Sequence, residues 1–199
     1  MTFQQMPIPD LFRSTVASVS TKLLPKLQAY DGGIQLIQFM HGHYEEVKQI
    51  LKQFTENETL NNKKFPLVVL LHDYPIKMGQ TGIYGEGEFH LLICTTTDPT
   101  FNSDDRYAKT FNPVLTPIYK ELMHQIAKNG IYFLTQGEGQ IQHTMIERLY
   151  WGRSGVYGNV SNIFNDWIDC IEITNLSLKI NNVHCQPGST GKLNSLQNG

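Results

Sequence analysis

The chain has 199 residues, 40% hydrophobic and 17% charged, with a formal net charge of −2. This length favours one globular domain with room for a core, and the near-neutral charge does not favour binding to nucleic acid or to an acidic membrane. No apolar run approaches the roughly 20 residues that a membrane span needs. Three cysteines without close spacing, and no signal-peptide pattern, argue against a disulfide framework and predict folding in a reducing cytoplasm.

The chain opens with a leader and a helix. Residues 1–9 have no periodicity and are expected to be extended. Asp10 is a candidate N-cap for a helix that begins at Leu11, in which apolar residues recur every three or four positions. Pro25 should kink or shorten this helix.

A strand and a second helix follow. Residues 34–40 alternate as a strand does, and Gly42 then breaks the chain. Residues 44–54 carry an apolar stripe at helical spacing, with Glu45 and Glu46 in the first turn, where the helix dipole favours them.

The most prominent pattern is a long antiparallel hairpin. Residues 67–71 form an unbroken apolar run, and residues 89–97 form a second run that stops at Asp98-Pro99. The connection between them is polar and rich in glycine, so residues 75–87 are expected to be a tip that projects from the sheet.

The second half predicts one helix and two strands. Ser103 or Asp104 should cap the helix, which Pro113 and Pro117 should split into two segments. Residues 141–151 and 167–180 read as strands on either side of a long loop, and a phase change in the second strand predicts a bulge near Asn175.

This order of elements predicts an α+β fold. A mainly antiparallel sheet with a long β-hairpin should be covered on one face by two or three helices. Residues 1–180 should form one domain, and residues 181–199, which are rich in Gln, Gly, Ser and Asn, should form a flexible polar tail.

The best metal candidate is the pair His41 and His43 with Glu45 nearby. Histidines two apart at a strand end can share a face, and a carboxylate could complete a site. No further ligand is fixed by spacing, so a small metal-dependent enzyme using these residues is an alternative rather than the main interpretation.

His72-Asp73 could be a base and its orienting acid, but neighbouring residues on a strand point to opposite faces. The sequence leans towards a protein that is not an enzyme and needs no cofactor.

Candidate interface residues lie in two glycine-rich segments. Ile76, Met78, Ile83 and Tyr84 are apolar residues at the hairpin tip with no evident core to enter. A second group places aromatics beside cations, which protein interfaces favour, and consists of Tyr150, Trp151 and Arg153, with Tyr157 in the loop that follows. A second alternative is therefore a soluble protein-binding module with a groove beside the hairpin.

Five stretches resemble structural proteins of phages and prophages of Bacteroidetes, including crAss-like phages. They are residues 65–73, 94–100, 112–119, 149–153 and 164–173, and the likeness covers most of the chain from about residue 34 to residue 180. These proteins look like tail-completion or tail-terminator components, which have a small α+β fold and assemble as a ring where head and tail meet.

The resemblance implies a virion protein of the tail or neck, made in the host bacterial cytoplasm. Its partners would be copies of itself in a sixfold or twelvefold ring, a portal-side adaptor or neck protein, and the next tail protein. Double-stranded DNA would pass through without specific binding, and no membrane would be involved. A neutral or acidic lining suits such a conduit, because a basic one would hold the duplex. Glu86, Glu88 and Glu138 are the candidate lining residues.

Overall fold

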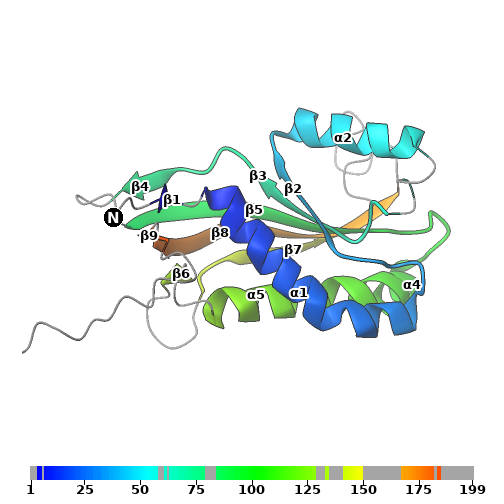
Figure 1. The fold of residues 1–199 in the computed structure, drawn as a ribbon. Coiled ribbons are helices and arrows are strands. Elements are labelled where there is room, and N and C mark those ends of the chain that lie inside the picture. Colours follow the sequence, from blue (N-terminus) through cyan, green and yellow to red (C-terminus); the bar gives the residue numbers. More distant parts are fainter. Residues whose placement is uncertain are drawn as a thin grey trace, which may run out of the picture.

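The computed structural model describes residues 4–5, 7–57, 61, 63–78, 84–128, 133–134, 141–149, 167–181 and 183–184. In this part of the chain, a mostly antiparallel sheet lies between helices, which confirms the predicted α+β class (Figure 1). The elements, in chain order, are β1 (Gln4–Gln5), α1 (Ile8–Tyr30), β2 (Gln38–Gly42), α2 (Tyr44–Glu56), β3 (Leu67–Leu71), β4 (Ile76–Met78), β5 (Tyr84–Thr96), α4 (Ser103–Arg106), η1 (Tyr107–Leu115), α5 (Thr116–Lys128), β6 (Phe133–Leu134), β7 (Thr144–Arg148), β8 (Ile168–Asn181) and β9 (Val183–His184).

The main sheet has the strand order β2-β3-β5-β8-β6, with β4 beside β5 and β7 beside β8. The strands β2 and β3 are parallel, while the other pairs of this sheet are antiparallel. Parallel neighbours cannot be joined by a tight turn, so α2 is the crossover between β2 and β3.

The long hairpin is confirmed, but its tip is shorter than expected. β3 pairs with β5 from Leu67 opposite Cys94 to Leu71 opposite His90, and β4 then pairs with β5 from Ile76 opposite Gly87 to Met78 opposite Gly85. The prediction that residues 75–87 are all connection is therefore wrong, because residues 76–78 and 84–87 are strands. Only residues 79–83 separate the two strands, and they lie outside the described residues.

One face of the sheet packs against α1 and the helix formed by η1 and α5 (Figure 1). At its centre, the rings of Phe12 in α1 and Phe89 in β5 lie 5.2 Å apart between centroids. These two large side chains are essentially inaccessible to solvent. Burying one such side chain contributes roughly 1.5–3 kcal/mol, and most of the buried apolar side chains belong to this layer.

The opposite face packs against α2, which was not expected from the sequence. Val47 and Leu51 of α2 lie on Met40, Val69 and other buried residues of the central strands. The two layers explain the unbroken apolar run of β3, because all five of its residues are buried. The predicted helical cover is thus present on the α1 side, and a further helix covers part of the other side.

The predicted start of the first helix is wrong. α1 begins at Ile8 after Pro7, and Pro9 lies in its first turn, where a missing N–H costs nothing. Asp10 is inside the helix, and its carboxylate accepts a hydrogen bond from Arg13 at 3.1 Å. The helix continues through Pro25 to Tyr30.

The predicted split of the third helix is also wrong, since helical backbone runs without a break from Ser103 to Lys128. Its N-cap is Asn102, whose Oδ1 accepts from the backbone N–H of Asp105 at 2.9 Å. Pro113 falls within the π-helical stretch η1. In a π-helix each N–H donates five residues back, so the carbonyl that Pro113 does not serve is that of Ala108. The Tyr30 hydroxyl donates to the next carbonyl, that of Lys109, at 2.8 Å.

The bulge predicted near Asn175 is confirmed. The pairing of β5 with β8 shifts register between Phe89 and Leu91, and Asn175 has a φ of 54°. The extra residue keeps the apolar residues on both sides of the bulge on the α1 side of the sheet.

The segment predicted to be a leader pairs with the segment predicted to be a tail, as far as the structure describes them. β1 and β9 form a two-stranded antiparallel ladder in which Gln4 faces His184 and Gln5 faces Val183. The prediction of an extended leader fails at Ile8, where α1 begins. The rest of the predicted tail lies outside the described residues.

Gly87 is required by close packing, which gives a testable prediction. A Cβ at this position would lie 2.5 Å from Cζ of Phe89, and that ring is itself packed against Phe12 and Tyr74. We expect Gly87→Ala to lower the free energy of unfolding by about 1–3 kcal/mol, measured by urea denaturation. Gly32→Ala is the control, because nothing lies within 4 Å of the added atom. Equal effects of the two substitutions would contradict the packing argument.

Candidate functional site

One end of the sheet forms an extension that we call the β-arm: β4, residues 84–88 of β5 and residues 176–181 of β8. β5 and β8, with 13 and 14 residues, run on past α2 to form it (Figure 1). Side chains alternate across the β-arm. Leu176, Leu178 and Ile180 join the core on the α1 side, whereas Glu86 and Glu88 are exposed on the α2 side.

The predicted interface residues are only partly described. Ile76 lies on β4, and 37% of its surface is exposed. Met78 ends β4 and Tyr84 begins β5, so both belong to the ladder of the β-arm rather than to a loop. The remaining predicted interface residues lie outside the described part of the chain, and they are Ile83, Tyr150, Trp151, Arg153 and Tyr157.

Two of the three candidate lining residues share one face. Glu86 and Glu88 are two apart on β5 and therefore point to the same side of the β-arm. Glu86 forms an ion pair with Lys179 of β8, with Nζ and Oε1 3.0 Å apart. Glu138 lies outside the described residues.

Next to the β-arm, a charged cluster is centred on Glu172 of β8. Its Oε1 lies 2.9 Å from Nε2 of His90, and its Oε2 accepts a hydrogen bond from Nε of Arg148 on the neighbouring strand. The hydrogen bond with His90 lowers the pKa of Glu172, burial opposes this, and Arg148 lowers the pKa further. Glu172 is thereby held as a carboxylate in the largely buried first half of β8.

A hollow of about 100 Å³ opens beside this cluster, where the chain leaves β3. Burial, with a smaller contribution from Glu172, raises the pKa of Tyr44 at its wall to about 12. The Tyr44 hydroxyl is therefore neutral over the physiological pH range. The lining residues come from the start of α2, the end of β3 and the middle of β5, and are Tyr44, Leu71, His72, Asp73, Tyr74, Glu88 and His90.

The candidate metal ligands do not share a site. His43 is the N-cap of α2, where its Nδ1 accepts from the backbone N–H of Glu45. His41 instead faces His72, with Nδ1 and Nε2 3.0 Å apart and the rings stacked. Burial lowers the pKa of His41, and His72 lowers it further. Among the residues that the structure describes, no group of three His, Cys, Asp or Glu side chains could hold a metal ion.

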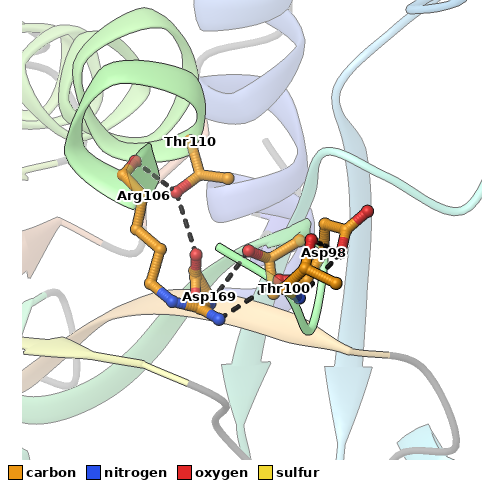
Figure 2. Close-up of polar contacts among 6 residues, drawn as sticks. Asp98, Thr100, Arg106, Thr110 and Asp169 are labelled. Carbon is orange, nitrogen blue, oxygen red and sulfur yellow. Dashed lines mark hydrogen bonds and ion pairs between the residues drawn. The ribbon is translucent and has the colours of Figure 1, made fainter. Parts of the chain in front are cut away.

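A buried ion pair joins the third helix to the sheet. Nη1 of Arg106 lies 2.6 Å from Oδ1 of Asp169 on β8, and both side chains are essentially inaccessible to solvent. The guanidinium also donates to the hydroxyl of Thr97 and to the carbonyl of Asp98, and the hydroxyl of Thr110 lies 2.9 Å from the other carboxylate oxygen (Figure 2). The pair occupies the point where α4 passes into η1.

Sequence reasoning missed these polar residues, although a signal was present. Asp169 and Glu172 are the two acidic residues among the apolar positions at the start of β8. Since isolated charges in a buried strand require partners, both could have been singled out. Their partners Arg106, Arg148 and His90 come from distant segments, so the sequence alone could not have paired them.

The Glu172 cluster predicts a pH dependence. The pKa of Glu172 is lower in the folded protein than its ordinary value of 4.5, so its contribution is complete above that value and is lost as the pH falls through the folded pKa. We expect Glu172→Gln to lower the free energy of unfolding at pH 7 by about 1.5–3 kcal/mol. As the pH falls below 4.5 and through the folded pKa, the difference from the unmodified protein should shrink, measured by urea denaturation across pH. A difference that is constant with pH would contradict this role.

No protein-family model matches the chain, and no curated protein matches it. Among the described helices, none combines the length and the apolar character needed to cross a bilayer.

Proposed function

We propose that this chain is a non-enzymatic structural protein of a tailed phage, one subunit of an oligomeric ring at the head–tail junction or in the tail. The proposal rests first on the resemblance of five sequence stretches to phage structural proteins. In this proposal the ring is part of the conduit for DNA, and its neighbours are a portal-side adaptor or neck protein and the next tail protein.

The observation that carries the proposal furthest is the β-arm. A ring subunit needs contacts that close on themselves, and a ladder that extends past α2 offers one open face and an edge for such contacts. Ile76 on the edge strand β4 is available to a neighbour, as the interface assignment requires. Glu86 and Glu88 share the other face of the β-arm with Lys77 and Lys179, which lie opposite Glu86 in the ladder, so this face is close to neutral. A lining without net positive charge would not retain passing DNA.

Quantitative mass spectrometry of purified particles tests this proposal. The chain should be present at six or twelve copies for each portal ring, and antibody labelling should place it at the neck or tail. Absence from particles made by a host that expresses the chain would overturn the virion assignment. Presence in one copy would overturn the ring.

The metal-dependent enzyme is less well supported, because His43 caps a helix and His41 faces His72. A protein-binding module is the second candidate, and one observation favours it: the hollow beside the hairpin, at the place where such a groove was predicted.

A further inference from the structure

The hollow arises from a gap in the hairpin. Leu71 is the last residue of β3 opposite β5, where it faces His90, and pairing resumes with Ile76 opposite Gly87. Between these points the chain leaves the ladder, and the N–H of Glu88 reaches the carbonyl of Pro75 at 3.4 Å. The gap exposes the side chains of β5 next to the first residue of α2.

The charge at the hollow is negative and uncompensated. Asp73 and Glu88 are exposed carboxylates at its rim, and neither forms an ion pair within the part of the chain that the structure describes. The two histidines do not neutralise them, since each uses Nε2 inside the protein: His72 with His41 and His90 with Glu172. A cation that entered the hollow would therefore meet two carboxylates without displacing a partner.

The walls of the hollow suit a planar cation. Tyr44 contributes an aromatic ring, and aromatic rings attract guanidinium and ammonium groups. The ring of Tyr74 packs on the α1 side of the sheet instead, against Phe89 and His72 at 5.0 and 5.6 Å between centroids, and this contact anchors the chain next to Asp73. Asp73 is held at a φ of 113°, a conformation that residues with a side chain rarely adopt, so its position is also fixed by its surroundings.

The size of the hollow limits what can enter it. Ligand pockets for whole small molecules usually have about 300–1,000 Å³, whereas this hollow has about 100 Å³. It has room for the end of one side chain. So small a contact gives little affinity by itself, and the remaining binding energy must come from the surface that presents the side chain.

We propose that this hollow is a docking site for one basic side chain, preferentially arginine, presented by a partner protein. Arginine is favoured over lysine because its planar fork can donate to two carboxylates at once while it lies against an aromatic ring. Such a site would serve a ring subunit and a protein-binding module alike.

The test is an NMR titration of isotope-labelled protein with N-acetyl-arginine methylamide, and in parallel with the citrulline analogue, which has nearly the same shape but no charge. Saturable shifts should appear at residues 72–74 and 88–90 with the arginine compound and should be at least about tenfold weaker with citrulline. Equal shifts with both compounds, or shifts with the arginine compound that do not localise to these residues, would overturn the proposal.

Substitutions on the protein provide the second arm of the test. Asp73→Asn and Glu88→Gln should each weaken arginine binding about five- to tenfold. Glu86→Gln is the matched control, because Glu86 lies two residues away on the same face, does not line the hollow and is paired with Lys179. If Glu86→Gln weakens binding as much as Glu88→Gln, the attraction is general and the hollow is not a site. Thermal unfolding of each variant verifies the fold.

Discussion

Replacing Asp169 by alanine should lower the free energy of unfolding by about 3–5 kcal/mol. The substitution leaves the guanidinium of Arg106 buried, with only 1% of its side chain exposed and without its carboxylate. It also removes the acceptor 2.9 Å from the hydroxyl of Thr110. The cost comes mainly from the uncompensated charge rather than from the value of the pair itself.

Urea denaturation of three variants separates the cost of the buried charge from the net value of the ion pair. The double variant Arg106→Met with Asp169→Leu removes both charges and should recover most of the lost stability. Asp105→Asn is the control, because Asp105 forms an ion pair with Lys109 at the surface and its loss should leave the unfolding midpoint nearly unchanged. If Asp169→Ala costs no more than Asp105→Asn, or the double variant is as unstable as the single one, the argument fails.

The position of this pair suggests a hypothesis for why it exists. Hydrophobic contacts between η1 and the sheet would tolerate sliding of the helix, whereas an arginine with three fixed acceptors would not. On this hypothesis, the ion pair fixes the register of the helix on β8, and the double variant should show weaker amide protection at η1 even where its stability is restored.

The sequence predicted those elements whose pattern is local. The helical stripe of residues 44–54 became α2, and the two apolar runs of the hairpin became β3 and most of β5. The bulge at Asn175 was also predictable, because a change of phase within an apolar strand has few other solutions.

Features that depend on distant segments could not be predicted. Pro113 lies within a continuous π-helical stretch, and the hydroxyl of Tyr30, from another helix, donates to the nearby carbonyl of Lys109. The side of the sheet that α2 covers is decided by the parallel pairing of β2 with β3, which no local pattern reveals. The sequence predicted a groove beside the hairpin only as part of an alternative function. The residues that line the hollow could not be predicted, because the gap between β3 and β4 determines them.

The largest effect on function is expected from shortening the β-arm. Met78 and Gly85 face each other across the hairpin, so replacing residues 79–84 with Asn-Gly would join them through a two-residue turn that hairpins favour. The change removes one described pair, Tyr84 opposite Asn181, and leaves both core layers intact. The shortened protein should therefore fold with a thermal midpoint close to that of the original.

If the β-arm is the contact between subunits or between rings, the shortened protein should be missing from particles. Incorporation should fall at least about tenfold. A lost contact of about 1.4 kcal/mol lowers the affinity tenfold, and every subunit of the ring would lose the same contact. The measurement is the amount of chain in purified particles from a host that supplies only the shortened form. Gly32→Ala is again the control, because it alters a turn remote from the β-arm. Normal incorporation of the shortened protein into infectious particles would show that the tip is a tolerated surface feature and that the interface lies elsewhere.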